Sequence, residues 1–178
     1  MRALVVVESM FGNTREVARA VARGLFPMIE VDLREVGHAP TRPGADVGLL
    51  VVGGPTHAFG MTRPSTRSDA RADGALVVAA PDVGLREWLA VLEPATPGTL
   101  VATFDTRVHR PRLPGSAARG ARKALRQRGF LPLDAPESFW VEGTTGPLLP
   151  GETERARAWG AALGRSARAR EHVGRTRA

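Results

Sequence analysis

Residues 2–25 read RALVVVESMFGNTREVARAVARGL, and their hydrophobic period changes at the short polar stretch in the middle. Ala3 to Val7 form a continuous apolar run, which is typical of a strand buried on both faces of a parallel sheet. From Asn13 onward the apolar residues recur at helical spacing, with Gly24 and Pro27 near the expected end. The stretch therefore predicts a buried strand, a tight loop and a helix.

The rest of the chain continues this alternation. Further strands are predicted at 28–36, 47–52, 100–104 and 138–141, and further helices after Asp82, after Ser116 and after Gly151, with Asp82 and Ser116 as caps. The segment 61–80 is polar first and apolar at 76–78, and we expect a long excursion with one short helix there. Five strands interleaved with helices predict an α/β fold, a doubly wound parallel sheet with helices on both faces.

Length and composition restrict the classes of protein. A chain of 178 residues is enough for one core, so we expect one domain over 1–165 and a basic, frayed tail over 166–178. The chain has no cysteine, which excludes disulfides, thiolate catalysis and cysteine-ligated metal centres. Redox chemistry would therefore need a bound cofactor. The first apolar run is too short for a signal sequence or a membrane span, and we expect a cytoplasmic protein.

The formal net charge of +7 is concentrated near the end of the chain. Five arginines and one acidic residue between Gly164 and Ala178 give this stretch more than half of the excess. One interpretation is a solvated tail; the alternative is a patch that steers an acidic partner. We expect no nucleic-acid partner and no metal.

The loop Ser9-Met10-Phe11-Gly12-Asn13-Thr14 joins the first strand to the first helix. Backbone N–H groups at a helix N-terminus lack intrahelical acceptors and bind anions. Ser9 and Thr14 add hydroxyl groups, and Gly12 permits close approach of the backbone. The loop predicts a phosphate site, although Asn13 or Thr14 could equally act as a simple helix cap.

Other phosphate-binding motifs are absent from the sequence. There is no Gly-x4-Gly-Lys-Ser/Thr motif, and no Gly-x-Gly-x-x-Gly follows a predicted strand. A response-regulator receiver would need an aspartate where Gly53-Gly54 stands. A nucleotide-hydrolysing, dinucleotide-binding or phosphoacceptor function is thus not supported.

The first loop resembles the phosphate loop of the flavodoxin family, with Phe11 in place of a usual hydroxyl residue. Pro55 to Gly60 resembles the loop that covers one side of the flavin ring in flavodoxins and related flavin-dependent quinone reductases. The resemblance implies a flavodoxin-like sheet of order 2-1-3-4-5 and flavin mononucleotide (FMN) as cofactor. It assigns the following residues to FMN: Ser9, Met10, Phe11, Gly12, Asn13, Thr14, Pro55, Thr56, His57, Ala58, Phe59, Gly60, Phe104, Asp105, Thr106, Arg107 and His109.

Individual roles within this set have alternatives. Phe59 offers a ring face to the flavin or belongs to the core, and His57 contacts the flavin or only solvent. Backbone N–H groups near Gly60 are expected to face flavin N5, and those of the segment 104–109 its pyrimidine edge. Arg107 stabilises the reduced flavin or pairs with Asp105. The chain has no tyrosine, which many flavodoxins place in this third loop.

Three functions follow from these expectations. The leading one is an FMN-binding electron carrier that has no catalytic side chain and exchanges electrons with a redox partner protein. An acidic partner would suit the basic charge of this chain. The second is an FMN-dependent NAD(P)H:quinone-type oxidoreductase, in which the segment 61–80 and His57 or His109 shape a substrate pocket. The third is a flavodoxin-like binding domain that has lost FMN.

Overall fold

The computed structural model describes residues 1–74, 83–111 and 114–176, with side chains through 172. In these residues a parallel sheet has the strand order β2-β1-β3-β4-β5, and a sixth strand, β6, also pairs with β4. The edge strand β2 (Glu30–Glu35) is followed across the sheet by the central strands β1 (Arg2–Val7), β3 (Val47–Pro55) and β4 (Leu100–Val108). The predicted order 2-1-3-4-5 is confirmed.

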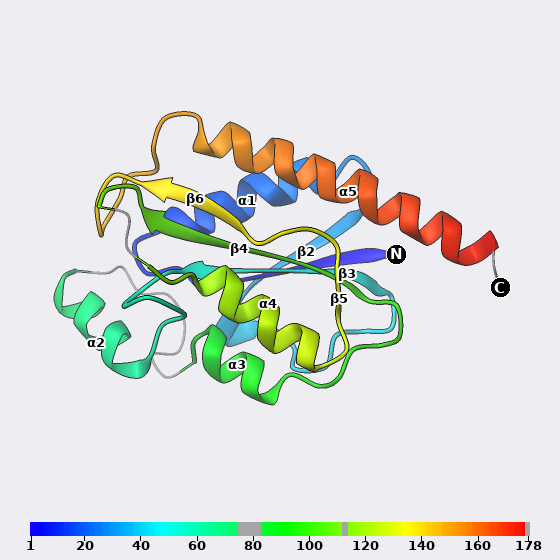
Figure 1. The fold of residues 1–178 in the computed structure, drawn as a ribbon, viewed down its shortest axis with the longest axis horizontal. Coiled ribbons are helices and arrows are strands. Elements are labelled where there is room, and N and C mark those ends of the chain that lie inside the picture. Colours follow the sequence, from blue (N-terminus) through cyan, green and yellow to red (C-terminus); the bar gives the residue numbers. More distant parts are fainter. Residues whose placement is uncertain (75–82, 112–113, 177–178) are drawn as a thin grey trace.

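Helices cover both faces of the sheet (Figure 1). On one face α1 (Asn13–Leu25) and α5 (Glu152–Thr176) bury a core with alternate residues of the central strands. On the other face α3 (Leu85–Val91) and α4 (Ala117–Gln127) bury the second core, which includes Trp88. Burial of both faces explains why β1 and β3 are almost continuously apolar.

The edge position beyond β4 is shared by two short strands, β5 (Leu131–Pro132) and β6 (Glu137–Val141). The sequence analysis predicted only the second of these. Pro132 lacks an N–H group and is compatible with an edge strand, which bonds on one side only. Because β6 pairs with Phe104–Val108, β4 continues past the predicted end at residue 104. The third flavin loop that was expected at 104–109 is therefore mostly β-strand, and this part of the prediction is wrong.

One short helix, α2 (Pro64–Ala72), follows β3 and lies beyond the carboxyl ends of the strands (Figure 1). It fulfils the expectation of one short helix in the segment 61–80. The apolar residues 76–78 and the predicted cap Asp82 lie outside the described residues. Helix α3 begins after Gly84, whose N–H donates to Glu87 Oε2 over 2.9 Å. The predicted cap of α4 is confirmed, since Ser116 Oγ accepts from Arg119 N over 3.1 Å.

The basic end of the chain differs from the expected frayed tail. Helix α5 does not stop at residue 165 but continues to Thr176. Ala167 is fully buried, and Arg168 donates through Nε and Nη2 to the carbonyl oxygen of Met28. Packing against the body of the domain thus holds at least the first turn of this basic segment. In the described part of the chain, no helix combines the length and apolar character that crossing a membrane requires.

Candidate functional site

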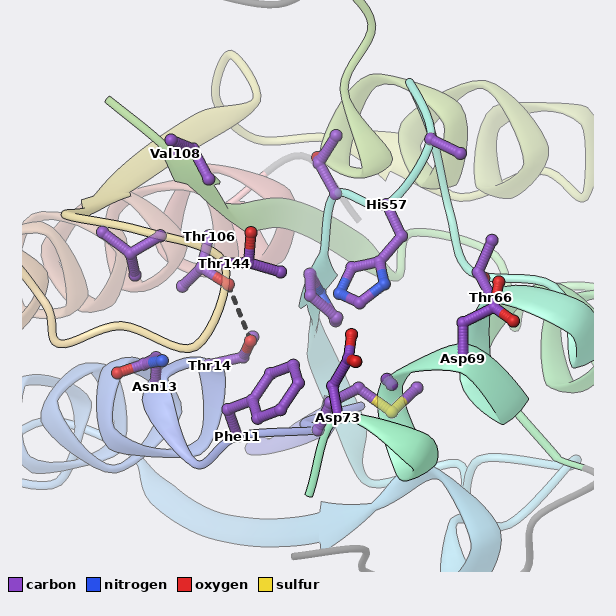
Figure 2. Close-up of a pocket in the computed structure, with 16 residues that line it drawn as sticks. Phe11, Asn13, Thr14, His57, Thr66, Asp69, Asp73, Thr106, Val108 and Thr144 are labelled. Atoms are coloured by element: carbon purple, nitrogen blue, oxygen red, sulfur yellow. Dashed lines mark hydrogen bonds between the residues drawn. The ribbon is translucent and has the colours of Figure 1, made fainter. Parts of the chain in front are cut away.

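A pocket of about 310 Å³ opens at the carboxyl ends of β1, β3 and β4 (Figure 2). In a doubly wound sheet this is the edge where ligands bind. Five segments supply its walls: the β1–α1 loop, the β3–α2 loop, α2, the end of β4, and the loop after β6. Its lining residues are Met10, Phe11, Asn13, Thr14, Pro55, Thr56, His57, Ala58, Thr66, Asp69, Ala70, Asp73, Thr106, Val108, Val141 and Thr144.

The β1–α1 loop presents free backbone N–H groups to this pocket. Gly12 precedes α1 with φ of 91° and caps it without a side-chain hydrogen bond. In the described residues, the N–H groups from Met10 to Thr14 have no acceptor, whereas the next one, of Arg15, donates to Ser9 Oγ over 3.2 Å. The positive end of the helix dipole adds to these groups. The loop thus has the unpartnered donors that an anion site requires, and the N-cap is Gly12 rather than Asn13 or Thr14.

Two side chains of the loop bind other segments. Thr14 Oγ1 lies 2.7 Å from Thr106 Oγ1, in a buried hydrogen bond between α1 and β4. One of the two hydroxyl groups donates to the other, so one hydroxyl hydrogen remains for a ligand. Asn13 Nδ2 donates to the carbonyl oxygen of Thr145 over 3.0 Å and holds the loop after β6 beside α1. That loop contributes Thr144 to the pocket, which the sequence analysis missed.

The β3–α2 loop turns sharply at its tip. His57 and Gly60 exchange two backbone hydrogen bonds of 2.9 and 3.0 Å, and Ala58 and Phe59 adopt positive φ of 42° and 71°. The Gly60 N–H is therefore used within the turn, contrary to the expectation that it would face a flavin. Phe59 is 59% exposed and does not line the pocket, so it is neither a core residue nor part of the pocket wall.

His57 does line the pocket, where Figure 2 shows it pointing into the same space as Phe11 and Asp73. Burial lowers the pKa of the His57 imidazole, because the charged form loses its hydration. The ring is therefore neutral at pH 7. The aromatic surface of the pocket thus comes from Phe11 of the β1–α1 loop and His57 of the β3–α2 loop, and not from Phe59.

Of the five residues predicted from β4 and its end, one lines the pocket, namely Thr106. Phe104 lies in the core, with its ring centroid 6.0 Å from those of Phe139 and Trp159. The guanidinium of Arg107 lies 5.6 Å from the centre of the Trp140 ring, and His109 stacks edge-on to the same ring at 5.7 Å.

Asp105 also turns away from the pocket and joins three elements. Its fully buried carboxyl group accepts from Thr56 Oγ1 (2.9 Å), Ser116 Oγ (2.6 Å) and the N–H of Ala118 (3.1 Å) at Oδ2. Ser138 Oγ donates to Oδ1 over 2.7 Å. The group thus fixes Thr56, a pocket residue, to α4 and β6, and the alternative of a surface pair with Arg107 does not describe its surroundings.

Helix α2 forms a wall that the sequence analysis did not resolve into residues. Thr66, Asp69 and Ala70 line the pocket from this helix, and Asp73 lines it from the C-cap position just after the helix. Both aspartates are exposed, and their spacing of four places them on one helical face. Among the residues that the structure describes, no arginine or lysine lines the pocket. The site is therefore polarised, with amide donors at α1 and carboxylates at α2.

A buried network attaches α2 to the sheet. Glu8, at the end of β1, accepts from Thr62 Oγ1 over 2.5 Å and from the N–H of Leu85 over 2.8 Å. Arg67 of α2 donates to Thr62 Oγ1 over 3.0 Å and pairs with Glu87 at 3.0 Å. Burial raises the pKa of Glu8 above its ordinary value, although these donors and the Arg67 charge act in the opposite direction.

The described residues contain no cluster of three or more His, Cys, Asp or Glu side chains that could hold a metal ion. The polar groups of the pocket are thus helix-terminal amides, threonine hydroxyl groups, a neutral imidazole and two carboxylates. Such a set is chemically suited to a ligand with an anionic end.

Comparison with known proteins gives structural but no sequence matches. No protein-family model and no curated protein matches the chain. A flavodoxin from the domain Archaea is 16% identical over 94% of this chain and 99% of its own, with a TM-score of 0.62. Flavodoxin 2 from Bacillus cereus is 20% identical over 93% and 99%, with a TM-score of 0.63. A diflavin flavoprotein A3 from Nostoc sp. is 14% identical over 97% of each chain, with a TM-score of 0.56. Together with the observed strand order, these similarities show that the chain has the flavodoxin-like fold.

Proposed function

We propose that this protein binds FMN in the pocket at the carboxyl edge of its sheet and transfers electrons to and from partner proteins. The observation that carries the proposal is the row of unpartnered N–H groups from Met10 to Thr14 in the described structure, which opens into that pocket. A phosphate monoester is the anion that such a helix terminus suits best. We propose the cytoplasm as its location.

The residues present fit the phosphate end of FMN. A Cβ added at Gly12 would meet no atom within 4 Å, so the space beside the loop is open. The hydroxyl hydrogen left over from the Thr14–Thr106 pair is a further donor. Phe11 and Val108 offer apolar surface within the same pocket. When bound, FMN would supply one- and two-electron redox chemistry, which a chain without cysteine cannot supply from its own thiols.

The side chains of the pocket would bind and orient the cofactor without taking part as acid or nucleophile. The neutral His57 ring brings no positive charge to the pocket. Asp69 and Asp73 disfavour additional negative charge on the α2 side. We therefore expect this protein to hold reduced flavin less tightly than oxidised flavin.

The proposal is tested by titrating the purified apoprotein with FMN and with riboflavin while flavin fluorescence is recorded. The phosphate should make FMN bind on the order of a hundredfold more tightly than riboflavin, since two charge-assisted hydrogen bonds suffice for such a factor. Thr14→Val should weaken FMN binding, whereas Thr41→Val, at an exposed position away from the pocket, should not. Equal affinities for FMN and riboflavin would contradict the phosphate site. Absence of flavin binding would favour a flavodoxin-like domain without cofactor.

A self-standing oxidoreductase is the second candidate, because α2 and His57 do enclose the pocket as a substrate site would require. His109 does not line the pocket and would have no part in it. Steady oxidation of NAD(P)H with a quinone by the FMN-loaded protein would support this candidate. Reduction only through a separate reductase would support the carrier.

A further inference from the structure

Helix α4 carries a row of cations on its outer face. Arg119, Arg122, Lys123 and Arg126 follow the spacing i, i+3, i+4, i+7, which places them on one side of the helix. The opposite side is buried through Ala118, Ala121 and Leu125. With Gln127 and Pro136, these four cations line a shallow groove of about 400 Å³, and no acidic residue of the described chain lines it. We call them the α4 basic stripe.

The charge of the α4 basic stripe is unmatched within the described chain. None of its four side chains takes part in a salt bridge or hydrogen bond there, whereas Arg15, Arg67 and Arg155 are paired with glutamates. The Nε atom of Arg122 is buried and has no acceptor in the described part. Four neighbouring cations repel one another, and an anionic surface that binds them relieves this repulsion. Because no acidic side chain of the described chain neutralises them, their attraction for such a surface is not reduced.

The α4 basic stripe begins beside the entrance of the candidate FMN pocket. The N–H of Ala117, the first residue of α4, donates to Thr56 Oγ1 over 2.9 Å. Gly115 packs on the backbone of Phe59 so closely that an added Cβ would lie 1.9 Å from the Phe59 carbonyl oxygen. Phe59 itself is 59% exposed. The exposed Phe59 thus lies against the segment that leads into α4.

We infer that the α4 basic stripe and Phe59 form the docking surface for an acidic redox partner protein. The inference rests on the proposed electron-transfer function, which requires a partner close to the pocket. Arginine presents a planar fork that matches carboxylates, and a single-sign patch accelerates encounter with an oppositely charged surface. Weak electron-transfer encounters bury little area, for which one exposed ring and a short charged helix face suffice. The nearness of the pocket favours a protein over a nucleic acid as occupant.

The test uses a fluorescein-labelled oligoglutamate peptide as the probe and fluorescence anisotropy as the readout. The variant R119Q/R122Q/K123Q/R126Q removes the stripe. The matched variant R19Q/R157Q/R165Q/R170Q removes the same charge from exposed positions of α1 and α5. The stripe variant should bind the peptide at least about tenfold more weakly, and the matched variant should change by less than about threefold. In ¹H–¹⁵N spectra of the native protein, the peptide should shift the signals of residues 117–127 most.

Three outcomes would overturn the inference. The first is an equal loss of peptide binding in both variants, which would show that net charge alone matters. The second is a shift pattern centred on α5. The third is tighter stripe-dependent binding of an oligothymidylate of matched charge, which would indicate a nucleic-acid site. FMN titration of the same variants keeps the two proposals separate: peptide binding at the stripe without FMN binding would refute the redox function and leave a docking surface for an acidic partner.

Discussion

Replacing Asp105 with asparagine tests how the fold holds the pocket. The carboxyl group of Asp105 accepts four hydrogen bonds, three of them at Oδ2. The amide oxygen of the introduced asparagine can occupy the Oδ2 position, and its NH₂ group can donate to Ser138, whose hydroxyl can also accept. Three bonds to a charged acceptor then become bonds to a neutral one, at a cost of roughly 0.5–1 kcal/mol each. We expect the free energy of unfolding to fall by about 2–3 kcal/mol.

Urea unfolding followed by tryptophan fluorescence measures this loss. Asp134→Asn is the matched control, because Asp134 also accepts two hydrogen bonds, from Ala135 N and Trp159 Nε1, but is exposed. Water can replace its lost contacts, so we expect a change below about 0.5 kcal/mol. A loss below about 0.5 kcal/mol for Asp105→Asn, or an equal loss in both variants, would refute the reasoning that the buried carboxyl group joins these elements.

Three further predictions concern other contacts. Burial raises the pKa of Glu8 in the folded protein, so the stabilising contribution of this residue is largest below its unfolded pKa and is lost as pH rises through the folded pKa. In urea titrations, the stability of the native protein relative to Glu8→Gln should therefore decline from about pH 4 upward. A difference that stays constant with pH would contradict this. Gly24→Ala places a Cβ 2.1 Å from a backbone oxygen of α5 and should lower the free energy of unfolding by about 1–3 kcal/mol. In Gly120→Ala the added Cβ meets only the flexible end of a methionine, so this variant should be as stable as the native protein or more stable. Equal effects of the two variants in thermal unfolding would refute the close packing at Gly24. Asn13→Ala removes the bond to Thr145 and should speed hydrogen exchange in residues 142–146, and unchanged protection there would show that the loop after β6 holds itself in place.

Local sequence patterns predicted most of the elements because these depend on neighbouring residues. The apolar run of β1, the helical spacing of α1 and the Ser116 cap are all properties of a short window. Strand β5 escaped prediction because Leu131–Pro132 gains its strand conformation only by pairing with Leu100 and Val101. The same long-range pairing converted the expected loop at 104–108 into strand.

The candidate site divides in the same way. The unpartnered N–H groups after β1 could be predicted, because a strand, a polar turn with glycine and a helix suffice to expose amide donors. The directions of Phe59 and Asp105 could not, since each is set by a distant partner: Gly115 lies against the Phe59 backbone, and Thr56 and Ser138 hold the Asp105 carboxyl group.

By itself, the sequence determined the alternation of buried strands with amphipathic helices and the polar, glycine-containing turn after the first strand. Hydrophobic period and turn chemistry act over a few residues and are therefore legible in one dimension. Only the tertiary structure decided that α2 closes the pocket with Asp69 and Asp73. It also decided that the cations of the α4 basic stripe have no acidic partner among the described residues. Both follow from which segments the sheet order brings together, and that order results from burying two apolar faces at once.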